Sequence, residues 1–215
     1  MAQIFPKWSN QAPRIAMGGL AIAGLLTVGG VWYYFSPEYT DVGYQPNQPI
    51  PFSHLQHAGE MELDCRYCHA QVERSAVATV PPSQVCMNCH LLVGRDRESL
   101  EPLYSSFDLD LPIAWVRVHK VPDYAHFDHG AHVRSGVGCS DCHGDIRTME
   151  KVTLMKPLSM AWCLDCHRDP TLHIRPMEEI TNTTWAPPPD QVEFARRVMQ
   201  EKNIQPPTDC SACHR

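Results

Sequence analysis

The sequence predicts a fold of short α-helices and coil that follows one long apolar helix. Three observations lead to this expectation. All ten cysteines of the 215 residues lie in five copies of the pattern Cys-x-x-Cys-His. Nineteen prolines and twelve glycines interrupt the chain, so long helices and sheets are not expected in most of it. The uncharged run Ile15–Phe35 is long enough to cross a bilayer as a helix.

The five Cys-x-x-Cys-His copies match the attachment pattern of c-type haem. Residues three apart share one face of a helical turn, so both thiols can bond the vinyl groups of one porphyrin while the next histidine binds iron. Zinc ribbons and disulfides also use paired cysteines, but neither requires a histidine after every second cysteine. We therefore expect five covalently bound haem c groups. The expected thioether residues are Cys65, Cys68, Cys86, Cys89, Cys139, Cys142, Cys163, Cys166, Cys210 and Cys213, and the expected proximal ligands are His69, His90, His143, His167 and His214.

The haems are expected to form the core themselves. Residues 36–215 leave about 36 residues for each of the five motifs, too few to surround five porphyrins with five ordinary hydrophobic cores. We therefore expect a multihaem cytochrome c, with short helices and coil organised around covalently bound haems. The formal net charge of −6 argues against nucleic acid as a partner.

The run Ile15–Phe35 is expected to be a transmembrane helix. Lys7 and Arg14 precede it, which places residues 1–14 in the cytoplasm, and the aromatic residues at 32–34 suit the far interface. A cleaved signal peptide is the alternative, but the apolar run is longer than a usual signal core. Both alternatives place the cysteine motifs on the exported side. We expect a single-pass protein of the bacterial inner membrane with its haem domain on the periplasmic or outer side.

The exported part contains an internal repeat. Phe52-Ser-His54-Leu-Gln-His57 precedes the first motif, and Phe127-Asp-His129-Gly-Ala-His132 precedes the third. In each case two haem motifs follow, which indicates two di-haem units. The expected segments are a Pro-rich linker at 36–51, a pentahaem domain at 52–215, di-haem repeats at about 52–90 and 127–167, a connecting excursion at 91–126, and a terminal haem at about 190–215 with a helix at 190–202. Asp190 and Glu193 have the spacing of a capping box at the start of that helix.

Seven further histidines are candidates for the opposite side of the five irons. Two histidines three apart on one turn can reach two neighbouring haems, and this pair occurs in both repeats. The expected distal ligands are therefore His54, His57, His129 and His132, together with His119. Met149 and Met160 flank the third and fourth motifs and could replace histidine at one iron. His126 and His173 have no counterpart in the other repeat and are expected to contact solvent or haem propionates.

The chain resembles the pentahaem cytochrome c subunit of alternative complex III. The resemblance lies in the single N-terminal helix, the five motifs, the run Val118-His119-Lys-Val-Pro-Asp123, and the segments from Gly136 to Gly144 and from Leu158 to Cys163. His126 departs from it, because a tyrosine-like residue is expected at that position.

This resemblance implies an electron-transfer subunit in a quinol-oxidising membrane complex. Its expected partners are an iron–sulfur subunit that donates electrons, integral quinol-binding subunits, and a mono-haem cytochrome or terminal oxidase that accepts electrons. The candidate distal ligands are numerous enough to complete every iron, so we expect this chain to transfer electrons and to have no substrate site of its own. The alternative is a stand-alone membrane-anchored multihaem quinol dehydrogenase feeding an exported reductase, and a terminal reductase of nitrogen or sulfur oxyanions would need an open iron position.

Overall fold

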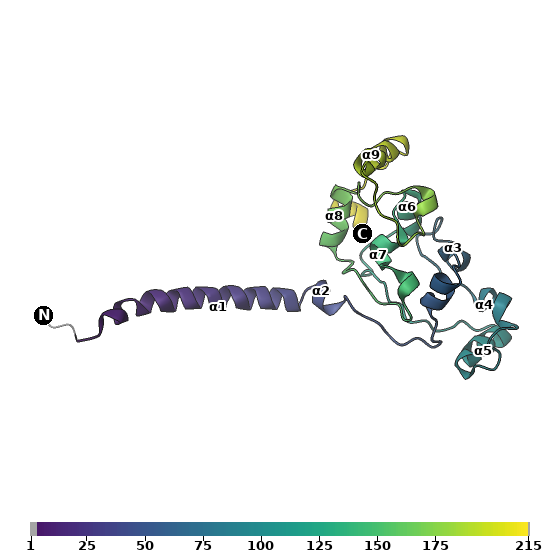
Figure 1. Cartoon of the computed structure of the whole chain (residues 1–215), viewed down its shortest axis with the longest axis horizontal. Helices are drawn as coiled ribbons and strands as arrows, with labels where there is room; N and C mark the ends of the chain where they lie inside the picture. Colours follow the sequence, from purple (N-terminus) through teal and green to yellow (C-terminus); the bar gives the residue numbers. More distant parts are fainter. Residues whose placement is uncertain (1–3, 215) are drawn as a thin grey trace. The chain divides into compact units, whose positions relative to one another are not determined.

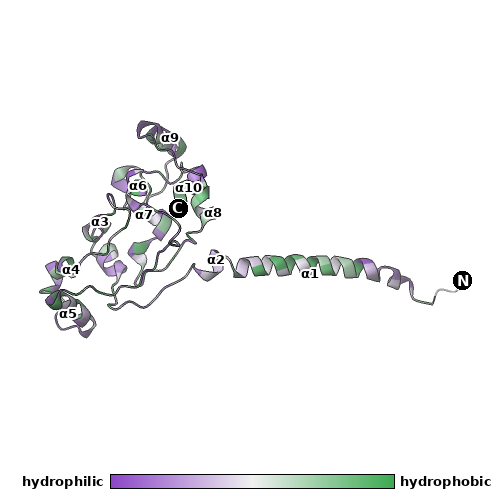
Figure 2. Ribbon diagram, turned by 180° about the vertical axis from the view of Figure 1, so that it is seen from behind, coloured by the Kyte–Doolittle hydropathy of each residue, from purple (hydrophilic) through white to green (hydrophobic). Residues whose placement is uncertain are grey.

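The computed structural model describes residues 4–214. The chain divides into two compact units, and the boundary along the sequence lies between Asp41 and Val42. The first unit consists of the 3-10 helix η1 (Lys7–Asn10), the helix α1 (Ala12–Tyr34) and the short helix α2 (Pro37–Thr40). Helix α1 begins three residues before the predicted apolar run, because Pro13 suits the first turn and Arg14 continues it. It contains 23 residues with a mean hydropathy of 1.8 and is coloured as largely hydrophobic in Figure 2. Among residues 4–214, one helix, near the N-terminus, is thus long and apolar enough to cross a membrane.

The second unit contains short helices joined by coil (Figure 1). The longest, α9, has 11 residues. Between residues 4 and 214 the β-structure consists of two isolated bridges, Ala125 with His214 and Val137 with Ile174. The predicted short helices and coil are confirmed. The helical elements are η2 (Leu55–Glu60), α3 (Cys65–Cys68), α4 (Ser83–His90), η3 (Glu98–Leu100), α5 (Glu101–Leu109), α6 (His129–Arg134), α7 (Cys139–His143), η4 (Ile146–Thr148), α8 (Met160–Arg168), η5 (Met177–Glu179), α9 (Gln191–Glu201) and α10 (Cys210–Cys213).

The segment expected to be an extended linker, 36–51, behaves differently in its two halves. Its first half forms α2, and its second half is part of the second unit. Gly43 N–H donates to the Leu154 carbonyl over 2.8 Å, and Leu154 N–H donates to the Tyr44 carbonyl over 3.0 Å. Gln48 makes two further hydrogen bonds to the backbone of Val116. An extended chain leaves its peptide groups free to pair with another segment, which is what residues 43–48 do.

A small hydrophobic core lies beside the second motif. Ile50, Met87 and Leu103 are each at most 5% exposed and pack together with aromatic side chains from the segment 104–115. The excursion 91–126 therefore contributes α5 to the core. This cluster is small for a domain of this length, as expected where haem supplies much of the buried apolar area.

The predicted helix at 190–202 is present as α9, but its N-terminus differs from expectation. The spacing of Asp190 and Glu193 suggested reciprocal capping bonds, whereas the Asp190 side chain makes none. Its ψ of 16° lies far from the extended conformation that a capping residue adopts. The next residue, Gln191, is instead buried and its amide donates to the carbonyls of Thr171 and Ile174, both over 2.6 Å.

Candidate haem-binding sites

Each Cys-x-x-Cys-His motif lies on a short helix, as the haem attachment geometry requires. Polar residues just before several motifs fix where the helix starts: the carboxylate of Asp64 accepts from Arg66 N–H, and that of Asp209 accepts from Ala212 N–H. The two thiols of such a motif therefore leave the same helical face. We number the sites along the chain as site 1 (65–69), site 2 (86–90), site 3 (139–143), site 4 (163–167) and site 5 (210–214).

Four of the expected proximal histidines are oriented by a hydrogen bond from Nδ1 to a backbone carbonyl. Such a bond places the second nitrogen, Nε2, as the ligand atom, which is the usual arrangement of a metal-binding histidine. The bonds are His69 to Thr79 at 2.8 Å, His90 to Val93 at 2.9 Å, His167 to Pro207 at 2.7 Å and His214 to Tyr124 at 3.3 Å. The donor chemistry and orientation of these residues fit a haem iron.

Three of the expected distal histidines carry the same orientation. The Nδ1 atom of His57 lies 2.8 Å from the Ser53 carbonyl, and that of His132 lies 2.7 Å from the Asp128 carbonyl. His129 reaches further, to the Ala76 carbonyl of the other repeat, over 3.3 Å. In all three this contact at Nδ1 leaves the Nε2 atom available to bind a metal.

The spacing between imidazole rings pairs these distal histidines with particular motifs. Metal–imidazole bonds are about 2.0 Å long and a ring centre lies about 1 Å behind its nitrogen, so rings on opposite sides of one iron have centres about 6 Å apart. The ring centres of three pairs have this separation: His57 and His90 at 6.2 Å, His129 and His143 at 6.3 Å, and His132 and His167 at 5.9 Å. The geometry thus fits axial ligand pairs at sites 2, 3 and 4.

The structure does not bring His54 and His119 into such a pair. The ring of His119 packs edge-on against His143 with centres 4.3 Å apart, which is closer than two ligands of one iron. Its Nε2 is buried without a hydrogen-bond partner, as is Nδ1 of His54. A buried unpaired nitrogen is costly unless another group binds it, and coordination to iron would bind Nε2 of His119.

Burial makes this histidine cluster poorly basic. It lowers the pKa values of His54 and His119 to about 4, with nearby imidazoles adding to the effect. Burial, followed by the neighbouring His119 and His129, lowers the pKa of His143 to about 3. These imidazoles therefore remain neutral at pH 7, and only the neutral form of the ring can bind a metal.

Site 4 includes a cavity large enough to receive part of a porphyrin. It measures about 540 Å³, and its lining includes His132, Cys166 and His167. Arg134 and Lys202 also line it and offer positive charge for propionate groups. The remaining lining residues are mostly apolar or proline: Val137, Pro170, Ile174, Ile204, Pro206 and Pro207.

The structure does not pair the side chains of Met149, Met160 and His126 with a particular motif histidine. Met160 is 61% exposed at the start of α8, and the Met149 side chain lies beside Gly144. The backbone N–H of His126 donates to the Cys213 carbonyl over 2.8 Å, so His126 adjoins site 5 through its backbone while its side chain is exposed.

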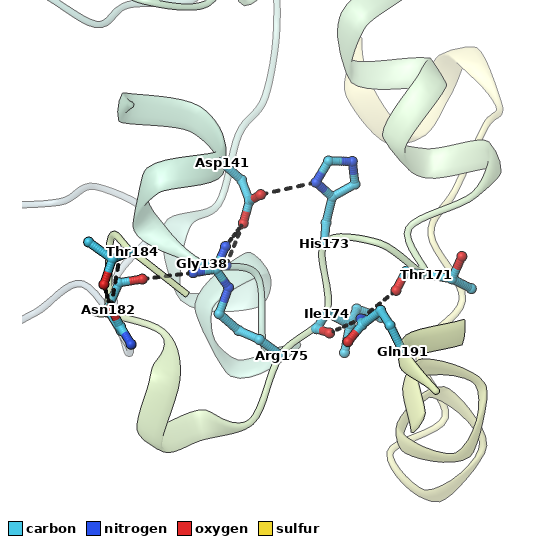
Figure 3. A network of polar contacts seen from close by, with 9 residues as sticks. All are labelled: Gly138, Asp141, Thr171, His173, Ile174, Arg175, Asn182, Thr184 and Gln191. Carbon is cyan, nitrogen blue, oxygen red and sulfur yellow. Dashed lines mark hydrogen bonds and ion pairs between the residues drawn. The ribbon is translucent and has the colours of Figure 1, made fainter. Parts of the chain in front are cut away.

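His173 has an orientation that the sequence did not indicate. Its Nδ1 lies 3.1 Å from an oxygen of Asp141, which sits between the two cysteines of site 3. The other oxygen of Asp141 accepts from buried Arg175 over 2.7 Å and from Gly138 N–H over 3.1 Å (Figure 3). A carboxylate–imidazole contact of this kind also orients metal-binding histidines. The separation of 32 residues left no signal in the sequence by which to find the pair.

Comparison with known proteins places this geometry in context. Residues 125–215 match the family model described as cytochrome c7 and related cytochrome c. The multihaem cytochrome c subunit of menaquinone reductase from Nitratidesulfovibrio vulgaris is 31% identical over 135 residues. The alignment covers 60% of this chain and 61% of that relative. With the short helices, the coil and the five motifs, these similarities confirm the multihaem cytochrome c fold and c-type haem binding.

Proposed function

We propose that this chain carries electrons through five haem c groups as a subunit of a membrane respiratory complex that exchanges electrons with the quinone pool. The observation that carries the proposal is the set of three imidazole pairs about 6 Å apart, because iron held by two histidines is saturated and transfers electrons without binding a substrate. Bound haem supplies one-electron redox chemistry. The protein orients the ligands and excludes other donors from the iron.

The proposed ligands follow from the motifs and the geometry. The five histidines that end the motifs are the proximal ligands, and the ten cysteines form the thioethers. His57, His129 and His132 are distal ligands at sites 2, 3 and 4. His54 and His119, both buried with one unpaired nitrogen, serve two remaining positions.

We further propose that α1 anchors the chain in the inner membrane, with the haem domain on the periplasmic or outer side. Its length and mean hydropathy support this, and Lys7 and Arg14 on one side support the orientation. The partners are an iron–sulfur subunit, integral quinone-binding subunits and a mono-haem cytochrome or oxidase, as the resemblance to alternative complex III implies.

The most detailed part of the proposal is the direction of the quinone reaction, which is either oxidation of quinol or reduction of quinone. The resemblance to alternative complex III favours quinol oxidation, whereas the relative from Nitratidesulfovibrio vulgaris is named as part of a menaquinone reductase. The electron-carrying role of this chain is the same in both cases. We propose quinol oxidation because the resemblance extends over most of the exported part.

Purification of the chain from its native membrane in mild detergent tests this function. We expect it to co-purify with an iron–sulfur subunit and integral membrane subunits, and we expect the assembly to reduce an added mono-haem cytochrome when menaquinol is supplied. If the assembly reduced menaquinone but did not oxidise menaquinol, only the direction would be wrong. A lone chain whose haems menaquinol reduces by itself would instead indicate the stand-alone quinol dehydrogenase.

A further inference from the structure

The five sites contact one another in an order that differs from their order along the chain. Sites 1 and 2 are joined directly within their motifs. Asn88, between the cysteines of site 2, donates a hydrogen bond to the Tyr67 hydroxyl, between the cysteines of site 1, over 3.0 Å. Site 2 therefore lies beside site 1.

Site 1 also lies beside site 3, although 73 residues separate their first cysteines at 65 and 139. The Thr181 hydroxyl donates to the Asp64 carboxylate over 3.1 Å. Ile180, the residue before Thr181, accepts a hydrogen bond at its carbonyl from Cys139 N–H over 2.9 Å. This double contact holds the start of α3 next to the start of α7.

One helix, α6, connects sites 3 and 4. His129 and His132 are three residues apart on this helix and thus on one face. The ring of His129 faces the site 3 histidine, His143, and the ring of His132 faces the site 4 histidine, His167. Two haems that take ligands from one helical turn must be neighbours.

Site 4 lies beside site 5. The Nδ1 atom of His167 donates to the Pro207 carbonyl over 2.7 Å, and Pro207 is three residues before the first cysteine of site 5. The C-terminal segment thus brings the last motif to the fourth.

We propose that the five sites form one electron path in the spatial order 2, 1, 3, 4, 5, in which the contact between sites 1 and 3 joins the two repeats and sites 2 and 5 are the ends. This deepens the proposed function, because it rests on haem at all five motifs. Each step moves one electron from a ferrous iron to the ferric iron of the adjoining site, and no bond forms or breaks. Electrons enter and leave the chain at sites 2 and 5.

The order can be tested by changing the potential of one iron and observing which others respond. Met in place of a distal His raises the potential of a haem, so His129→Met keeps site 3 reduced over a wider range. The added electron at site 3 lowers the potential of whichever irons are closest, because like charges repel. Stepwise oxidation of the full-length protein, followed by NMR with each haem assigned, reports these shifts one haem at a time.

We expect His129→Met to shift the midpoint potentials of sites 1 and 4 more than those of sites 2 and 5. An arrangement in sequence order predicts the largest shifts at sites 2 and 4, so a larger shift at site 2 than at site 1 overturns the proposal. His57→Met provides an independent variant: one large shift, at site 1, supports the order, and equal shifts at sites 1 and 3 contradict it. Leu109→Met, at a side chain on α5 that is 66% exposed and is no candidate ligand, is the matched control and should leave all five potentials unchanged.

Two measurements separate this result from other failures. The intact mass shows whether each variant still carries all haems, and the iron positions in the haem-loaded complex, seen by electron cryomicroscopy, give the order without any variant. Iron 1 nearer to iron 2 and iron 3 than to the others supports the proposal, and any other neighbours of iron 1 overturn it. A protein with five haems in a different order would leave the proposed function intact, whereas a protein without haem at some motifs would contradict that function first.

Discussion

At the residue scale, seven of the histidines proposed to bind iron are oriented by a hydrogen bond at Nδ1. In all seven the partner is a backbone carbonyl, as with Ser53 for His57 and Thr79 for His69. A backbone carbonyl fixes both the tautomer and the direction of the imidazole ring, so no charged side chain is needed for this purpose. The course of the backbone therefore orients these imidazole rings.

Removal of one distal ligand should affect one haem. In His132→Ala the iron of site 4 loses the imidazole that faces His167, so we expect about one fifth of the haem to become high-spin and to bind carbon monoxide when reduced. Electron paramagnetic resonance and carbon monoxide difference spectra measure this fraction. His126→Ala is the control, and an unchanged spectrum in His132→Ala would show that another residue binds the site 4 iron.

Asp64 should make the stability of the fold depend on pH in acid solution. The side-chain hydrogen bond from Arg66 is the main cause that lowers the pKa of Asp64 to about 2. A carboxyl whose pKa is lower in the folded state stabilises the fold above its ordinary pKa of 3.8, and this contribution is lost as the pH falls from 3.8 toward 2. We expect acid unfolding, followed by circular dichroism, to depend less on pH in this window in Asp64→Asn. Asp165→Asn, at a carboxylate that is 78% exposed, should behave as the natural protein does.

At the element scale, extended segments and short helices are fixed by polar side chains rather than by large apolar faces. Gln45 donates to the Thr153 hydroxyl over 2.6 Å, and the Lys151 ammonium donates to Asn47 over 2.7 Å, so the segment after α2 is held along residues 151–154. Coil without such partners would leave its peptide groups unpaired. Haem-binding coil is therefore ordered by many small contacts.

Helix α9 should depend on its first residue. Gln191 is 3% exposed, and its amide satisfies two carbonyls in the loop that carries His173. Gln191→Ala leaves both carbonyls unpaired, and we expect a loss of about 1–3 kcal/mol in the free energy of unfolding. Chemical denaturation followed at the haem bands measures this loss. Gln200→Ala, at an exposed position of the same helix, should cost less than about 0.5 kcal/mol, and an equal loss in both variants would show that the buried amide is unimportant.

At the scale of the whole molecule, the two repeats are joined as one unit by contacts that cross from one to the other. Gly130 N–H donates to the Ser75 carbonyl over 3.0 Å, and the Arg134 guanidinium donates to the Glu73 carbonyl over 2.7 Å. The distal histidine of site 3 is held by Ala76 in the same way. The segments 73–76 and 129–134 therefore hold each other in place, and the orientation of His129 depends on the backbone of the other segment.

The intact protein should contain five haems and remain with the membrane. We expect a mass that equals the full chain plus five haem c groups, and we expect the protein to stay in the membrane fraction after an alkaline carbonate wash, because α1 is long enough to span the bilayer. Mass spectrometry and fractionation measure both. A mature N-terminus near Val31 together with release by carbonate would indicate a cleaved signal sequence instead.

The sequence by itself determined the haem motifs, the apolar helix, the repeat and the candidate ligands, because each depends on residues close together in the chain. The motif requires three-residue spacing, and the histidine pair at 54 and 57 shares one turn in the same way. Local spacing also predicted α9, with bounds within one residue of those observed. It failed for the Asp190 cap, where burial of Gln191 decided the local conformation.

Only the tertiary structure decided which imidazoles face each other, which segment holds the chain after α2, and which sites are neighbours. The contact of Thr181 with Asp64 spans 117 residues, and the contact of His173 with Asp141 spans 32. Such pairs depend on how the whole backbone folds and leave no periodic pattern in the sequence. The local spacing of residues thus identifies the five attachment sites. Their order in space is set by long-range hydrogen bonds between the short helices that carry them.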